Sequence, residues 1–130
     1  MRLQTTAFLA KSHEFLNKAQ DLLDAHRWPD EAGRASYLAG LHAAQALIFE
    51  CTGKVIKRHR GVQNELRRLT KDKPRFDLEL RAFLGRTYNL KAIADYETGP
   101  GAEVTVDQAE EAIESAQRFI AGIEELLAAR

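Results

Sequence analysis

A few side chains in this sequence could take part in acid–base chemistry or hold an anion. His59 stands exposed in a basic segment, where neighbouring positive charges disfavour a protonated imidazole and would leave a neutral base. Asp95 and Tyr96 come just before Gly99-Pro100-Gly101. They either bind a ligand or, in the plainer interpretation, Tyr96 packs while Asp95 pairs with an arginine, and the residues leave both interpretations open.

The segment from Lys54 to Arg75 has the strongest charge asymmetry in the chain. It contains nine lysine or arginine residues but only two acidic ones, Glu65 and Asp72. Cationic side chains neutralise phosphates, so RNA, DNA or a nucleotide could bind here. The alternative is an ordinary solvated surface, balanced by the acidic C-terminal region. The nine cations are Lys54, Lys57, Arg58, Arg60, Arg67, Arg68, Lys71, Lys73 and Arg75.

The sequence predicts neither a metal site nor a cofactor. None of its four histidines has a cysteine, carboxylate or second histidine at metal-ligand spacing, and no phosphate-binding glycine loop or dinucleotide motif occurs. His42 lies in an apolar helical stretch, where a satisfied core or interface histidine is commoner than a catalytic one. Cys51 is interpreted as a small buried hydrophobe. The histidines are His13, His26, His42 and His59.

The composition indicates one globular domain covering residues 1–130. Hydrophobic residues make up 45% of the chain and charged residues 29%, and 19 basic side chains balance 19 acidic ones. A single cysteine and a start without a signal-peptide pattern lead us to expect a cytoplasmic protein. The longest stretch without charged residues, Ala35 to Phe49, is too short to span a membrane, so no membrane association is expected.

Apolar residues recur at helical spacing along the whole chain and predict an all-α fold. The second predicted helix is apolar on two sides and rich in alanine, with Gly40 among the alanines, which places it at the bundle centre or at a subunit interface. Gly53 is expected to end this helix. We therefore predict an antiparallel up-and-down bundle of about five helices, at about residues 7–25, 30–52, 61–71 and 77–97 and from about residue 105 onward, with a basic loop at 53–60.

The buried face is ambiguous in the fourth predicted helix and well defined in the fifth. In the fourth helix, Leu80, Leu84 and either Tyr88 or Thr87 form a stripe that continues to Lys91. The fifth helix should begin with a capping box, in which Thr105 and Gln108 satisfy free backbone donors. Its buried face should then comprise Ala109, Ile113, Ala116, Ile120, Ile123 and Leu127.

Three segments together resemble the HEPN (higher eukaryotes and prokaryotes nucleotide-binding) domain family. Residues 34–47, Arg-Ala-Ser-Tyr-Leu-Ala-Gly-Leu-His-Ala-Ala-Gln-Ala-Leu, resemble the family's second helix, a tyrosine followed by Ala-x-x-His-Ala-Ala-x-Ala-Leu. Residues 57–62, Lys-Arg-His-Arg-Gly-Val, are similar to its Lys-x-His-x-Gly-Val turn. Residues 91–96, Lys-Ala-Ile-Ala-Asp-Tyr, are similar to its Arg-x-x-Ala-Asp-Tyr helix end. The resemblance covers nearly the whole chain in the family's order.

The resemblance implies a helical bundle that commonly forms a homodimer, with the motif-bearing helices lining a cleft between subunits. Many relatives pair with a small nucleotidyltransferase as a toxin with its antitoxin, and some cleave RNA. It thus implies a nucleotidyltransferase-type partner and a nucleotide or RNA ligand. The ligand-binding candidates are Tyr37, His42, Lys57, His59, Lys91, Asp95 and Tyr96.

The sequence departs from the pattern of the nuclease members, which carry an arginine, four to six residues and then a histidine. No histidine follows His59, and Lys91 occupies the arginine position of the related subgroup. Lysine keeps the charge but loses the planar fork that holds phosphate through two bonds. We therefore expect a binding protein rather than an enzyme. The alternatives are a metal-independent ribonuclease toxin, with His59 as general base and Lys91 and Asp95 assisting, and a scaffold without a ligand.

Overall fold

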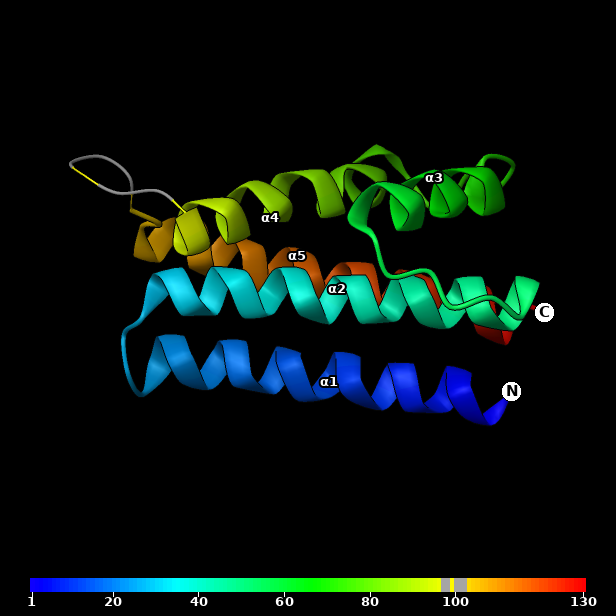
Figure 1. Cartoon of the computed structure of the whole chain (residues 1–130), viewed down its shortest axis with the longest axis horizontal. Helices are drawn as coiled ribbons and strands as arrows, with labels where there is room; N and C mark the ends of the chain where they lie inside the picture. Colours follow the sequence, from blue (N-terminus) through cyan, green and yellow to red (C-terminus); the bar gives the residue numbers. More distant parts are fainter. Residues whose placement is uncertain (97–98, 100–102) are drawn as a thin grey trace.

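The computed structural model describes residues 1–96, 99 and 103–130, and within these residues it contains five α-helices and no strand (Figure 1). The all-α expectation is therefore confirmed. Helices α1, α2 and α5 run side by side along the long axis, and α3 and α4 follow one another across one side of α2. The helices are α1 (Leu3–Asp24), α2 (Pro29–Thr52), α3 (His59–Thr70), α4 (Leu78–Tyr96) and α5 (Val106–Ala128).

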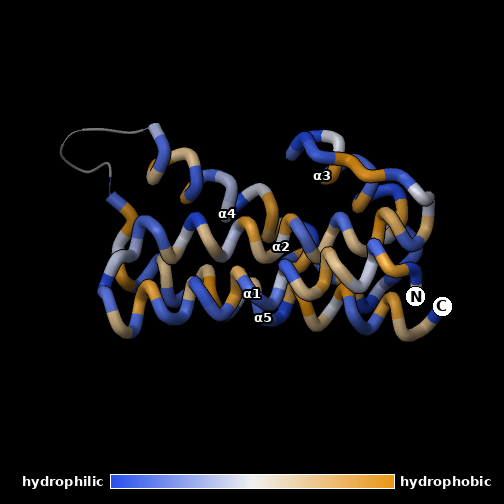
Figure 2. Tube along the Cα trace, turned by 60° about the horizontal axis from the view of Figure 1, so that its bottom comes forward, coloured by the Kyte–Doolittle hydropathy of each residue, from blue (hydrophilic) through white to orange (hydrophobic). Residues whose placement is uncertain are grey.

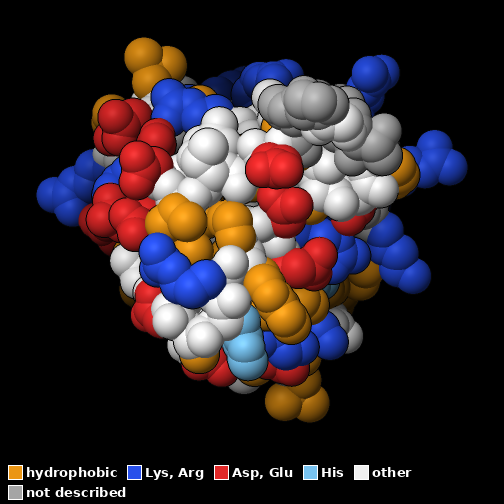
Figure 3. Space-filling view, turned by 90° about the vertical axis from the view of Figure 1, so that its left-hand side faces the viewer, with side chains coloured by type: hydrophobic (Ala, Val, Ile, Leu, Met, Phe, Trp, Pro, Cys, Tyr) orange, Lys and Arg blue, Asp and Glu red, His pale blue; other side chains and the backbone are white. Residues whose placement is uncertain are grey.

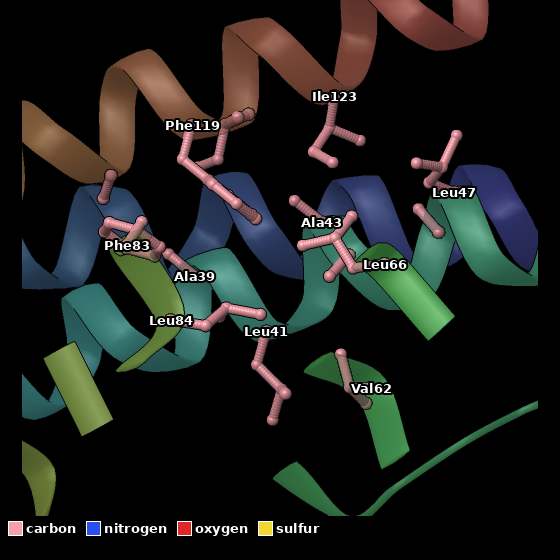
Figure 4. Packing of buried hydrophobic residues seen from close by; sticks show 14 of the residues in the cluster. Ala39, Leu41, Ala43, Leu47, Val62, Leu66, Phe83, Leu84, Phe119 and Ile123 are labelled. Carbon is pink, nitrogen blue, oxygen red and sulfur yellow. The ribbon is translucent and has the colours of Figure 1, made fainter. Parts of the chain in front are cut away.

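Helix α2 is the centre of the bundle and contacts each of the other four helices. Its small residues allow this close packing. A side chain on Gly40 would collide with the ring of Phe83 from α4, so glycine is required for the two helices to approach this closely. Ala39 is fully buried in the same region (Figure 4). The central placement predicted for this alanine-rich helix is confirmed.

Aromatic rings join α5 to α4 and to the segment just before α4. Phe83 stacks on Phe119 with ring centroids 4.7 Å apart, and Phe76 meets Phe119 edge-on at 5.7 Å. All six residues predicted for the inner face of α5 are buried. Figure 2 shows the periodicity behind this core, because hydrophobic positions recur at helical intervals along the traces of the long helices.

The helix ends follow local sequence signals. Pro29 occupies the first turn of α2, where its missing N–H costs nothing. Gly53 ends α2 in the left-handed conformation, with φ 73°, and its N–H donates to the Phe49 carbonyl. The predicted capping box is present, because Thr105 Oγ1 accepts from the Gln108 N–H while the Gln108 side chain accepts from the Thr105 N–H.

Two predicted helix starts were wrong. Helix α1 begins at Leu3, because Arg2 and Thr5 bind the Glu50 carboxylate and hold this end against α2. Helix α3 begins at His59, so the basic loop is only 53–58. In α4, where the stripe left Tyr88 or Thr87 open, it is Thr87 that turns inward. Glu97, the predicted end of the fourth helix, and Thr98, Pro100 and Gly101 of the following loop lie outside the described residues.

No described helix combines the length and the apolar character that crossing a membrane would require.

Candidate functional site

The candidate site forms where α2, the start of α3 and the second half of α4 meet. We call it the aromatic–cation cluster, and it comprises Arg34, Tyr37, His59, Tyr88, Lys91 and Asp95. Four of these six residues were predicted from sequence as ligand-binding candidates, and a fifth candidate, Tyr96, borders the cluster next to Lys91. Helix α2 supplies Arg34 and Tyr37 one turn apart, α3 supplies its first residue, and α4 supplies the other three on successive turns.

Tyr37 and His59 connect α2 to α3 inside this cluster. The Tyr37 hydroxyl is hydrogen-bonded to Nδ1 of His59 at 2.8 Å, and Tyr37 is only 2% exposed. Tyr88 completes the group from α4. Its ring stacks on the His59 imidazole with centroids 4.1 Å apart and planes 19° from parallel, and it meets Tyr37 edge-on at 5.5 Å. The histidine is therefore held in one orientation by two tyrosines.

Burial is the main cause of the pKa shifts of His59 and Tyr37. It lowers the pKa of the His59 imidazole, and a hydrogen bond with the Gln63 side chain opposes this shift. Burial, reinforced by Tyr88, raises the pKa of the Tyr37 hydroxyl well above its usual value. The expectation that His59 stands exposed among cations was wrong, because the ring is half-buried against aromatic side chains. Its preference for the neutral form comes mainly from loss of hydration.

The charged part of the cluster is centred on Asp95. Lys91 Nζ lies 2.7 Å from one carboxylate oxygen, and Arg34 Nε lies 3.0 Å from the other. The hydrogen bond from Lys91 is the main cause that lowers the pKa of the Asp95 carboxyl, and Arg34 adds to it. One carboxylate thus holds two cations from different helices, and the three groups carry one net positive charge.

Lys91 also lies between two tyrosine rings. Its Nζ is 6.0 Å from the centroid of Tyr88 and 5.6 Å from that of Tyr96. Tyr88 is 38% exposed and Tyr96 is 75% exposed, whereas the Lys91 side chain is only 21% exposed. The arrangement presents a cation between two solvent-accessible aromatic surfaces.

Two predicted candidates lie apart from this cluster. His42 faces α1, with its ring centroid 5.5 Å from that of Phe15, and its Nδ1 is hydrogen-bonded to Gln45 Oε1. Gln45 in turn donates to the carbonyl of Ile56, so His42 helps to hold the 53–58 loop against α2. Lys57 is an exposed residue of that loop.

Sequence reasoning did not select Arg34 or Tyr88 as site residues. Arg34 lies one turn before Tyr37 and Tyr88 lies one turn before Lys91, so helical spacing could have indicated both.

The basic segment 54–75 lies beside the cluster and makes few ion pairs with the described residues. Arg68 pairs with Glu65 in the same helix, and Arg75 pairs with Glu125 of α5. We predicted that the acidic last helix balances the charge of this segment. Among the described ion pairs, only Arg75–Glu125 joins the two. Figure 3 shows the bundle end away from α3, where acidic and basic side chains are interspersed.

Among the residues that the structure describes, no group of three or more histidine, cysteine, aspartate or glutamate side chains is placed to hold a metal ion.

A comparison with protein families agrees with this helical architecture. The family model described as the HEPN domain matches residues 5–126, which extend from the first turn of α1 to the last turn of α5. No curated protein matches the chain in sequence.

Proposed function

The chain belongs to the HEPN family, and we propose that it is a binding protein that takes up a nucleotide or RNA at the aromatic–cation cluster and pairs with a nucleotidyltransferase-type partner. Membership of this family suggests a nucleotide- or RNA-related function. We further propose that the chain acts as a homodimer, as the HEPN half of a toxin–antitoxin-type pair. The observation that carries the ligand proposal is the position of Lys91 between two accessible tyrosine rings.

A nucleotide offers the two kinds of group that this position can hold. Its phosphate is attracted to Lys91 and Arg34, whose combined charge exceeds that of Asp95. Its base has a flat face that can stack on Tyr88 or Tyr96, and such stacking contributes about 1–3 kcal/mol per base in single-stranded complexes. The exposed cations of the 53–58 loop would add contacts to further phosphates of an RNA.

The hydrogen bonding of His59 favours binding over catalysis. The Tyr37 hydroxyl stays protonated, so we assign its proton to the bond with Nδ1 of His59. A neutral imidazole that accepts at Nδ1 carries its own hydrogen on Nε2, and no ring lone pair then remains free to remove a proton from a ribose hydroxyl. A ribonuclease mechanism with His59 as general base would require this bond to break.

Titration of a fluorescein-labelled single-stranded RNA, followed by anisotropy at low and moderate salt, tests the ligand proposal. We expect Lys91→Gln to weaken binding about tenfold, since a charge-assisted contact is lost and Asp95 then repels phosphate more strongly. Lys71→Gln removes the same charge from an exposed position in the basic segment and is the matched control. Equal effects of the two variants would reject the cluster as the ligand site.

The same RNA, incubated with the protein without metal and resolved on a denaturing gel, distinguishes binding from cleavage. We expect intact RNA with both the wild type and His59→Ala. Cleavage that disappears in His59→Ala would replace the binding proposal with the ribonuclease alternative.

Affinity purification of the tagged chain from its native cells at low salt, followed by mass spectrometry, tests the pairing. Recovery of a nucleotidyltransferase-type protein in near-stoichiometric amount is expected, whereas recovery of the chain alone would reject the paired system.

A further inference from the structure

A separate groove between α4 and α5 has the chemistry of a second binding site. Its volume is about 200 Å³, and none of its lining residues belongs to the aromatic–cation cluster. Its walls include the apolar side chains of Leu80, Phe83, Leu90 and Ala112. A hollow of this size is smaller than the sites that hold drug-sized ligands, so it suits one small apolar group.

Two arginines, Arg86 of α4 and Arg118 of α5, line this groove. Helices α4 and α5 are antiparallel (Figure 1), and the stacking of Phe83 on Phe119 fixes their register. Arg86 lies three residues after Phe83, and Arg118 lies one residue before Phe119. Because the helices are antiparallel, a step forward in α4 and a step back in α5 go in the same direction. The backbone positions of the two arginines are therefore only about 3 Å apart along the helix axes.

The acidic residues of the groove lie toward its two ends. The same register places Glu79 and Glu111 each about 7.5 Å along the axis from the nearer arginine. Neither arginine forms an ion pair with a carboxylate of the described residues, and the one hydrogen bond given for them runs from Arg118 to the Ser115 hydroxyl at 3.3 Å. The groove is therefore lined by apolar side chains and by two exposed arginines that make no ion pair with a described carboxylate.

We infer that the α4–α5 groove binds a carboxylate that is attached to a small apolar group. The two guanidinium groups can donate to both carboxylate oxygens, and the apolar group is then buried against Phe83 and Leu90. The glutamates at the ends repel a longer polyanion, so RNA does not fit this groove. The inference is independent of nucleotide binding at the cluster, because the two sites share no residue.

Isothermal titration calorimetry with isocaproate, and with isocaproamide as its neutral counterpart, tests this site. The wild type should bind isocaproate at least about tenfold more tightly than the amide, since one charge-assisted contact contributes about that factor. Arg86→Gln and Arg118→Gln should each weaken isocaproate about tenfold, and Arg67→Gln, an exposed arginine of α3, should change nothing. Lys91→Gln should also leave isocaproate binding unchanged, which separates this result from the proposed nucleotide site.

Absence of isocaproate binding, equal binding of acid and amide, or equal binding by the two arginine variants and the wild type would overturn the inference. A pentapeptide with a C-terminal leucine identifies the source of the carboxylate. Tighter binding than isocaproate supports the chain end of a protein partner as the ligand, and weaker binding supports a free small acid.

Discussion

The Tyr37 hydroxyl on α2 is hydrogen-bonded to Nδ1 of His59, the first residue of α3, at 2.8 Å. This contact joins the start of α3 to α2, and it occupies the ring nitrogen that a catalytic histidine would need. Its consequences for stability and protonation can be measured separately.

Tyr37→Phe removes the hydroxyl and leaves Nδ1 of His59 without this partner. We expect the free energy of unfolding to fall by about 1 kcal/mol, the usual net contribution of such a bond, in urea titrations followed by circular dichroism. Tyr96→Phe, which alters a 75% exposed side chain, should leave stability unchanged. An unchanged urea midpoint for Tyr37→Phe would show that the hydrogen bond does not anchor α3.

Protonation of His59 should destabilise the fold. Because burial lowers its folded-state pKa below the ordinary value of 6.5, the unfolded chain binds protons first as the pH falls. Stability should therefore decline from about pH 6.5 downward and level off below the folded-state pKa, with His42 contributing in the same sense. Asp95, whose pKa is lowered from 3.8, should matter only in more acidic solution. Urea midpoints measured across this pH range check the prediction, and His59→Gln should make the decline smaller and leave the part due to His42.

Gly40→Ala should destabilise the protein by about 2 kcal/mol, because the added methyl group collides with the Phe83 ring in a closely packed core. The matched control is Gly85→Ala in α4, where the new carbon would lie 3.4 Å from the Gln63 side chain. That change should be neutral or stabilising by up to about 1 kcal/mol, since alanine favours a helix interior. Similar urea midpoints for the two variants would contradict the packing described for α2 and α4.

Arg27→Gly should stabilise the chain by roughly 1 kcal/mol. Arg27 follows α1 with φ 54°, a conformation in which a side chain is strained and glycine is not. The turn itself should persist, because the N–H groups of Arg27 and Trp28 donate to the carbonyls of Leu23 and Leu22 in either variant. Thermal unfolding followed by circular dichroism measures the shift, and a lower midpoint would show that the arginine side chain stabilises the turn.

Helical periodicity predicted the fold because each long helix buries a regular apolar face. The six inward residues of α5 and its capping box are local patterns that tertiary contacts did not alter. The start of α1 was harder to predict, because Leu3 is almost fully exposed and the first turn depends on Glu50, which is far away in the sequence.

The candidate site was only partly predictable because a motif does not specify which way each side chain faces. Tyr37 and His42 belong to one motif, but five helical residues rotate them by about 140°, so they face α3 and α1 respectively. The stripe in α4 allowed either Thr87 or Tyr88 to face inward. Packing against the neighbouring helices buries Thr87 and leaves Tyr88 to stack on His59.

The most direct test of the central claim is photocrosslinking of a short single-stranded RNA that contains thiouridine, followed by mass spectrometry of the modified peptides. We expect crosslinks at Tyr88 or Tyr96, on either side of Lys91, and we expect Lys91→Gln to reduce their yield about tenfold. Crosslinks confined to the outer face of α3, or a yield that Lys91→Gln leaves unchanged, would contradict a nucleotide site in the aromatic–cation cluster.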